Sequence, residues 1–217
     1  HSHLGLALEA LGRMADAEQS HRRAVSLAPE GTSQLNNLGV LLLNTGRPGE
    51  ALPLFEKAVR LKPDYADAHN NVGLARQRLG QLAASLPSYA RALALQPQHA
   101  TFLNNYGTAL QSSGALGEAA DVLERAVRLK PDYAEAHNNL ALVRTLQGRT
   151  DDALRCTELA LKLRPNYADA HHNRAHALHG AGRLDEAVAS YEAALAAEPG
   201  HLRARSEEHT SELQSHS

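Results

Sequence analysis

Prolines recur at one fixed interval through most of this 217-residue chain, and that interval constrains the fold more than any other feature. They stand 34 residues apart, at Pro29, Pro63, Pro97, Pro131, Pro165 and Pro199. A glycine column keeps the same interval, at Gly12, Gly46, Gly80, Gly114, Gly148 and Gly182. This period is typical of a repeat of two helices, in which each repeat buries its apolar face only against its neighbours.

The columns predict where the helices end. Glycine adopts the left-handed conformation without a Cβ penalty, so we expect it to end the first helix of each repeat. Proline cannot continue a helix, so it marks the turn between repeats. Two further prolines, Pro53 and Pro87, are predicted to lie in the first turn of second helices that start near residues 50 and 84. A column of small residues predicts a close crossing of two helices and runs through Gly5, Gly39, Gly73, Gly107, Ala141 and Ala175.

With this pattern, and with segments such as Lys62-Pro63-Asp64-Tyr65-Ala66-Asp67-Ala68-His69-Asn70-Asn71-Val72-Gly73, the chain resembles the tetratricopeptide-repeat (TPR) family over residues 1 to about 204. The resemblance implies an all-α fold: an α-solenoid of antiparallel helix pairs, stacked as a right-handed superhelix with the first helices on its concave face. The expected repeats are 1–31 (truncated), 32–65, 66–99, 100–133, 134–167 and 168–201. Some positions depart from the family pattern, because Arg76, Arg144, Arg174 and Thr157 stand where an apolar core residue is usual.

Both ends of the sequence break the pattern. The chain begins at His1 rather than Met, so we expect that its first residue is not the native N-terminus. After Pro199 the register predicts Asn at 207 and a small residue at 209, where Glu207 and His209 stand. Residues 205–217 resemble the translation of a sequencing adapter, and we exclude them from functional reasoning. The alternative is a divergent polar capping helix.

Composition excludes several classes of protein. The formal net charge of -2 gives no general attraction to nucleic acid or to an anionic membrane surface, and we expect neither as a partner. No run of about 18 apolar residues predicts a membrane span. The single cysteine, Cys156, fits a reducing compartment, so the expected location is cytoplasmic, although a cysteine-poor periplasmic protein would look the same.

The most informative motif is a pair of asparagines in the first helix of each repeat. The second member forms an unbroken column at Asn37, Asn71, Asn105, Asn139 and Asn173. On a helical wheel this position points nearly opposite the core stripe, so we expect exposed side chains. A side-chain amide carries donors and an acceptor, so it can bond to the N–H and C=O of a peptide backbone. Adjacent first helices lie about 8–10 Å apart, a distance that about three residues of an extended peptide would span.

This column resembles the asparagine ladder of the O-linked N-acetylglucosamine transferase family, which grips the backbone of bound protein segments. The resemblance implies a peptide-binding role for Asn37, Asn71, Asn105, Asn139 and Asn173. The alternative is that these amides bond to the adjacent helix or remain solvated. A second binding mode of the family captures carboxylates with lysines on the first helices. It is not expected here, because the matching positions hold Ser33, Asp67, Thr101, Glu135 and Asp169.

Three histidines in the last repeat form a weak candidate metal site. The spacing of His172, His176 and His179 places them on one helical face. No carboxylate or cysteine joins them at a matching spacing, so the favoured interpretation is polar groups lining a groove, with no metal and no cofactor. Tyr65, Tyr133 and Tyr167 follow the repeat-ending prolines, where they either stack on a ligand or pack between repeats.

These observations predict a scaffold for protein–protein interaction that binds extended peptide segments on its concave face and has no catalytic site within residues 1–204. The alternative is the substrate-recognition arm of a larger TPR-containing enzyme, such as a glycosyltransferase, whose catalytic domain is missing. We also expect possible self-association through ends that lack a capping repeat.

Overall fold

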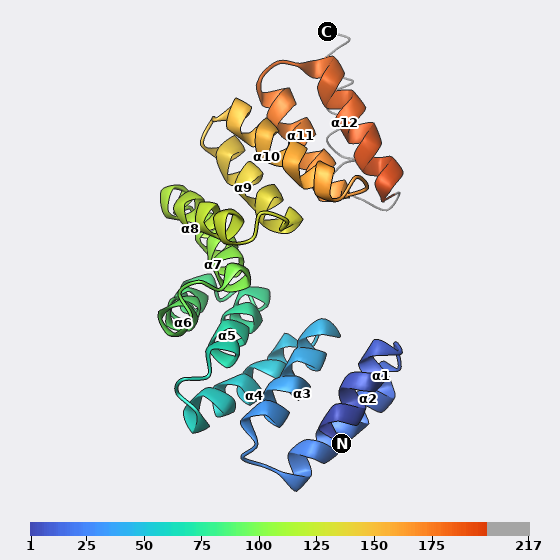
Figure 1. The fold of residues 1–217 in the computed structure, drawn as a ribbon, viewed down its shortest axis with the longest axis vertical. Helices are drawn as coiled ribbons and strands as arrows, with labels where there is room; N and C mark the ends of the chain where they lie inside the picture. The colour runs from blue at the N-terminus through green and yellow to red at the C-terminus, as the bar shows by residue number, and fades with distance from the viewer. Residues whose placement is uncertain (199–217) are drawn as a thin grey trace. The chain divides into compact units, whose positions relative to one another are not determined.

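The computed structural model describes residues 1–198, which form helices joined by short turns (Figure 1). The first helices of the repeats are α1 Ser2–Ala10, α3 Thr32–Asn44, α5 Ala66–Arg78, α7 Ala100–Ser112, α9 Ala134–Leu146 and α11 Ala168–Gly180. The second helices are α2 Met14–Leu27, α4 Pro48–Leu61, α6 Leu82–Leu95, α8 Leu116–Leu129, α10 Thr150–Leu163 and α12 Leu184–Ala197. No strand is present in this range, so the all-α repeat fold is confirmed. The segment resembling an adapter lies outside the described residues.

The chain forms two compact units. One comprises residues 1–109, with α1 to α6 and most of α7. The other begins at Leu110 and contains α8 to α12. Successive helices pack against each other from α1 to α6 and from α8 to α12, and α3 also contacts α5, as α9 contacts α11. First helices of neighbouring repeats therefore lie side by side inside a unit.

The glycine column ends the first helices as predicted. All six glycines have a positive φ, between 72° and 83°. After α3, the N–H of Arg47 donates to the carbonyl of Leu42 at 2.8 Å, and the N–H of Gly46 donates to that of Leu43 at 3.2 Å. This pair of bonds is a Schellman motif, which satisfies the last carbonyls of the helix and turns the chain toward the second helix.

The small-residue column lies where the two helices of one repeat cross. A Cβ added to Gly39 would stand 2.5 Å from the ring of Phe55, and one added to Gly73 would stand 2.7 Å from the ring of Tyr89. Each ring belongs to the residue 16 positions further along the chain. The missing side chain thus makes room for an aromatic ring in the core of the repeat.

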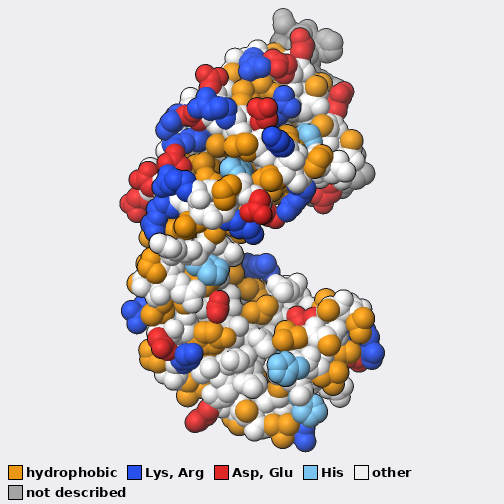
Figure 2. Space-filling model, in the orientation of Figure 1, with side chains coloured by type: hydrophobic (Ala, Val, Ile, Leu, Met, Phe, Trp, Pro, Cys, Tyr) orange, Lys and Arg blue, Asp and Glu red, His pale blue; other side chains and the backbone are white. Residues whose placement is uncertain are grey.

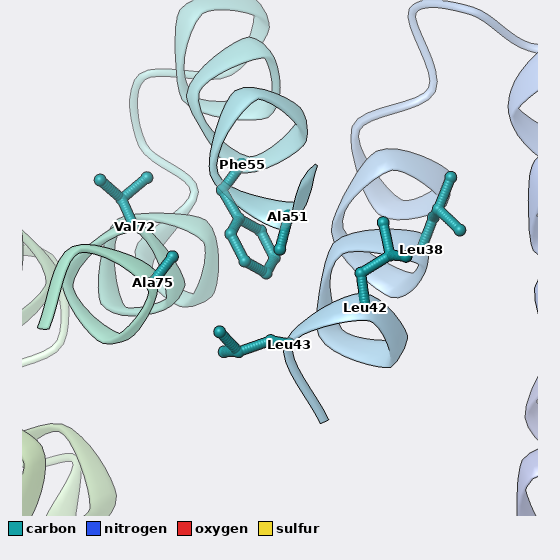
Figure 3. Close-up of a cluster of buried hydrophobic side chains, with 7 residues drawn as sticks. All are labelled: Leu38, Leu42, Leu43, Ala51, Phe55, Val72 and Ala75. Atoms are coloured by element: carbon teal, nitrogen blue, oxygen red, sulfur yellow. The ribbon is translucent and has the colours of Figure 1, made fainter. Parts of the chain in front are cut away.

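Apolar side chains from three successive helices fill the core between repeats. The cluster in Figure 3 combines Leu38 and Leu42 of α3 with Phe55 of α4 and Val72 of α5, all at most 3% exposed. Because one cluster takes side chains from two repeats, neither repeat could bury it alone.

The expectation for the two early prolines was wrong. Helix α4 begins at Pro48 rather than near residue 50, and α6 begins at Leu82, so Pro53 and Pro87 both lie inside helices. Each removes one backbone donor and leaves the carbonyl four residues earlier, on Gly49 or Ala83, without its helical partner. Gly49 and Ala83 are exposed, so water can serve these carbonyls.

Candidate functional site

The second asparagine of a pair bonds to the first helix of the preceding repeat at several places in the chain. Asn71 Nδ2 donates to Asn36 Oδ1 at 2.9 Å, and Asn105 Nδ2 donates to Asn70 Oδ1 at 3.0 Å. In the second unit Asn173 Nδ2 donates to Asn138 Oδ1 at 2.9 Å. Partner and donor are always 35 residues apart, which is one repeat plus one residue. The structure thus links the two asparagine columns by a regular inter-repeat hydrogen bond.

The first repeat keeps this bond with a different acceptor. Asn37 Nδ2 donates to Ser2 Oγ at 3.1 Å, and Ser2 occupies the place of the first asparagine of the pair. Asn139 holds the same position on α9 as these donors hold on their own helices. The structure therefore places Asn37, Asn71 and Asn105 on neighbouring helices of the first unit, and Asn139 and Asn173 on neighbouring helices of the second.

The expected exposure of the column was overstated. Asn37, Asn71, Asn105, Asn139 and Asn173 are all half-buried. The first members of the pairs are buried, and their exposed fractions are 8% for Asn36, 5% for Asn70, 7% for Asn104 and 4% for Asn138. A helical wheel assumes that a helix is buried on one side only. Here a first helix is also covered in part by the first helix of the neighbouring repeat. The bond to the adjacent helix, given above as an alternative, is present.

Hydrogen-bonding capacity remains on the side-chain amide of Asn71. An asparagine side chain has two N–H donors and an oxygen with two lone pairs. Asn71 uses one donor on Asn36, and its oxygen accepts from Asn70 Nδ2 at 3.3 Å. One N–H and one lone pair are left for a further partner, and the bond to Asn36 orients them.

Two rows of residues flank the asparagine column in the first unit. Three residues after Asn37 and Asn71, on the same helical face, lie Val40 and Leu74, which are half-buried at the edge of the core cluster. At the start of the first helices lie exposed polar residues such as Ser33 and Asp67. The column thus runs between an apolar row and a polar row.

Glu135, the corresponding residue of α9, is engaged within its own repeat. Burial disfavours its ionised form, but the hydrogen bond and the positive charge of Arg164 outweigh this effect and lower its pKa overall. A carboxylate here would repel a carboxylate ligand, which agrees with the expectation that the lysine-based binding mode is absent.

The histidines of the last repeat do not assemble a metal site. The ring of His172 packs edge-to-face against Tyr191 of α12, with 5.7 Å between the ring centroids. Across residues 1–198, no group of three or more His, Cys, Asp or Glu side chains is arranged to hold an ion. The spacing of His172, His176 and His179 placed them on one face, but the packing of α12 directs the first ring into a contact within the repeat.

Other histidines have a role that the sequence did not reveal. His69 Nε2 lies 3.0 Å from the carbonyl oxygen of Pro63, and His137 Nε2 lies 2.9 Å from that of Pro131. His171 makes the same contact with Pro165 at 2.9 Å. These imidazoles tie the start of a first helix to the turn before it. The recurring interval of six residues between the proline and the histidine was the available signal.

The tyrosines after the prolines pack at the turns between repeats. Lys62 Nζ lies 5.3 Å from the ring centroid of Tyr65, and Arg164 Cζ lies 4.6 Å from that of Tyr167. Burial is the main reason that the pKa of Tyr167 rises to about 12. Burial likewise raises the pKa of the Cys156 thiol, which disfavours the thiolate that a nucleophile needs. These side chains serve packing.

Comparison with known proteins identifies the family. Models described as tetratricopeptide repeat match residues 1–35, 73–134, 134–167 and 168–201, and one described as TPR repeat matches residues 42–80. The chain is a tetratricopeptide-repeat protein. The TPR is a protein-interaction repeat, so this chain is an interaction scaffold. A search of the curated proteins found no match.

Several solved TPR structures share the fold. PilW, a type IV pilus biogenesis factor, is 21% identical with a TM-score of 0.84, and the match covers 94% of this chain and 95% of PilW. TTC0263, a thermophilic TPR protein of Thermus thermophilus, is 28% identical with a TM-score of 0.71, covering 84% of this chain and 100% of TTC0263. YrrB, described as a TPR protein with an unusual peptide-binding site, is 21% identical with a TM-score of 0.66, covering 88% of this chain and 98% of YrrB.

The surface of this TPR protein carries charges of both signs. Figure 2 shows Lys and Arg side chains interspersed with Asp and Glu over the face in view. In the described part of the chain, none of the helices has the length and apolar character that crossing a membrane would require.

Proposed function

We propose that this TPR protein binds extended peptide segments by their backbone, through Asn37, Asn71, Asn105, Asn139 and Asn173. The observation that carries the proposal is the donor and lone pair left on the oriented amide of Asn71, in a column whose members recur on successive first helices. A peptide N–H and C=O form a complementary pair for such an amide. Because the amide is already held by the preceding repeat, little side-chain entropy is lost on binding.

The inter-repeat bond changes what the asparagines are expected to do. Besides contacting a ligand, they contribute to stacking, since each bond joins two repeats. A typical hydrogen bond of this kind contributes about 0.5–1.5 kcal/mol to folding. Removing the column should therefore cost some stability as well as affinity, and the two effects must be measured separately.

A peptide selected from a random-sequence display library is a suitable probe. Its affinity would be compared with that of the same peptide N-methylated at single backbone positions, which removes one donor at a time. Methylation in the bound stretch should weaken binding about tenfold, the cost of a lost hydrogen bond with its partner left unpaired. Affinity that follows the peptide side chains and ignores backbone methylation would refute a backbone-directed grip.

Variants of the protein test the same interaction from the side of the asparagines. Asn71→Ala combined with Asn105→Ala removes two members of the column, and Ser33→Ala is a control on an exposed position of the same helical surface. The double variant should bind the selected peptide at least tenfold more weakly while it remains folded by circular dichroism. Unchanged affinity would assign the asparagines to repeat stacking alone.

The same column supports the second candidate, a substrate-recognition arm of a larger TPR-containing enzyme related in style to O-linked N-acetylglucosamine transferase. In that case the bound segment would be the substrate presented to a separate catalytic domain. Mass-spectrometric identification of the intact protein would decide between the two, because only the second requires a catalytic domain on the same polypeptide.

We further propose self-association through the first repeat. Leu4 holds the same repeat position as Leu38 and Val72, yet it is 53% exposed whereas they are 3% exposed. Leu11 and Met14 nearby are 71% and 45% exposed. Sedimentation velocity should show a mass that rises with concentration and returns to the monomer value in Leu4→Glu. A monomer at every concentration would refute the proposal.

A further inference from the structure

A groove in the last two repeats is lined by residues of α10 and α11 and by Arg183, the residue before α12. It encloses a cavity of about 550 Å³ lined by Leu154, Glu158, Leu161, Lys162, Arg174, Leu178 and Arg183. This volume lies within the range usual for small-ligand sites.

In two other repeats an arginine occupies the corresponding position, which holds leucine at Leu8, Leu42 and Leu110. Arg76 on α5 reaches Glu56 of α4 at 2.9 Å and Ser88 of α6 at 3.2 Å. Two repeats further on, Arg144 on α9 makes the same ion pair with Glu124 of α8 and is only 8% exposed. Arg76 thus bridges the second helices α4 and α6, and Arg144 is paired with α8.

In the last repeat the arginine is displaced by one helical turn. Glu158 occupies the position of Glu56 and Glu124, but the position of the arginine holds Leu178, and Arg174 stands four residues earlier. Arg174 replaces a residue that is buried in other repeats, such as Leu140 at 5% exposure, and is itself exposed. Glu158 therefore lacks the arginine partner that Glu56 and Glu124 have, and a charged side chain stands where other repeats have an apolar one.

The lining combines an apolar floor with a basic rim. Leu154, Leu161 and Leu178 supply the floor, while Lys162 and Arg174 provide cationic donors. Among residues 1–198, neither Lys162 nor Arg174 has an ion-pair partner within 4.0 Å. Arg183 is paired with Glu186 at 2.7 Å. Lys162 and Arg174 lie beside one lining carboxylate, Glu158, and Arg174 also interacts electrostatically with Glu186.

We propose that this cavity is a second binding site, for a carboxylate attached to an apolar group about the size of a phenylalanine side chain. The apolar group occupies the leucine floor, and the carboxylate accepts hydrogen bonds from Arg174 and Lys162. The site is independent of the asparagine column: its residues lie on α10, α11 and α12 and include none of the asparagines.

N-acetylphenylalanine is the probe, with N-acetylphenylalaninamide and acetate as controls that lack the charge or the ring. In ¹⁵N-labelled protein the acid should shift the amide signals of Leu154, Arg174 and Leu178 saturably at about millimolar concentrations. The two controls should bind at least tenfold more weakly. An amide that binds as well as the acid, or shifts spread over the whole chain, would overturn the proposal.

Two variants test the cause of the cavity. Arg174→Gln changes only an exposed side chain and should weaken binding of the acid about tenfold, as loss of a charge-assisted hydrogen bond predicts. Arg174→Leu combined with Leu178→Arg restores the pattern of Leu140 and Arg144, and it should close the groove and abolish the shifts. Binding unaltered by Arg174→Gln would overturn the proposal even if the double variant failed to fold.

A hexapeptide that ends in phenylalanine with a free carboxylate distinguishes the two sources of this chemistry. If it binds at least as tightly as N-acetylphenylalanine, the site takes the end of a protein chain. If only the free acid binds, the site takes a small molecule. Either result supports recognition of an apolar carboxylate. If neither probe binds, the proposal is refuted.

Discussion

Asn71 and Asn36 are joined by a 2.9 Å hydrogen bond between the first helices of two successive repeats. Asn36 is 8% exposed, whereas Asn71 is half-buried and keeps part of its amide available. One residue therefore acts within the stack, and the other acts both in the stack and at the surface. Both residues therefore stabilise the stack, and only Asn71 is also part of the proposed binding surface.

Replacement of Asn36 tests this division. Asn36→Ala should lower the free energy of unfolding by about 1–2 kcal/mol, because a hydrogen-bonded polar side chain is lost from a buried site. Asn71→Ala should cost a similar amount, since it leaves Asn36 Oδ1 without its donor. Urea denaturation followed by circular dichroism measures both. Unchanged stability in both variants would show that the bond contributes nothing to stacking.

Replacement of Gly39 tests the crossing of α3 and α4. Gly39→Ala should destabilise the protein by about 1–3 kcal/mol, because the new Cβ would stand 2.5 Å from the Phe55 ring. The low end is expected, since Ala175 faces Tyr191 at the same position of the last repeat. Gly49→Ala is the matched control. A Cβ there meets nothing within 4 Å, so stability should rise by up to about 1 kcal/mol. Equal effects would contradict the crowding at Phe55.

The ion pair between Arg144 and Glu124 predicts an asymmetry. Arg144→Leu reproduces the residue found at Leu42 and should change stability by less than about 1 kcal/mol, because apolar packing replaces the pair. Glu124→Ala should cost about 1–3 kcal/mol, since it leaves a guanidinium that is 8% exposed without its carboxylate. A thermodynamic cycle over both single variants and the double variant measures the coupling. Equal losses in the two single variants would argue against this interpretation.

Low pH should reduce the stability of the first unit, because protonation of Glu18 removes its ion pair with Arg47. A hydrogen bond from Arg47 at 2.8 Å is the main cause of the lowered pKa of Glu18. A carboxyl group with a lower pKa in the folded state stabilises the fold above its unfolded pKa, and this contribution is lost as pH falls through the folded value. Stability should therefore decline below about pH 4, by no more than about 1 kcal/mol because the pair is partly exposed.

Carboxyl NMR titration checks the cause of this decline. The midpoint for Glu18 should lie below that of an unperturbed glutamate and should move upward in Arg47→Gln. The same variant should flatten the acid-dependent loss of stability. A Glu18 midpoint that ignores Arg47→Gln would assign the acid sensitivity to other carboxyl groups.

Much of the fold could be predicted because the repeat encodes it locally. The period of 34 residues, the left-handed glycines such as Gly46 and the turn prolines such as Pro63 each act within a few residues of their own position. Their effect on the backbone is therefore readable from a single chain. The predicted exposure of the asparagine column was wrong because first helices pack against each other, which leaves Asn37 half-buried. The predicted start of α4 was wrong in a different way, because the helix begins at Pro48 and contains Pro53.

The sequence by itself determined the repeat, the order of the helices and the position of the asparagine column. Only the tertiary structure decided that Asn71 bonds to Asn36, that Arg144 pairs with Glu124 and that Arg174 lines a cavity. The physical reason is the range of the interactions. Helix ends depend on backbone conformation at one residue, whereas a side-chain partner 20 or 35 residues away is set by how the helices stack.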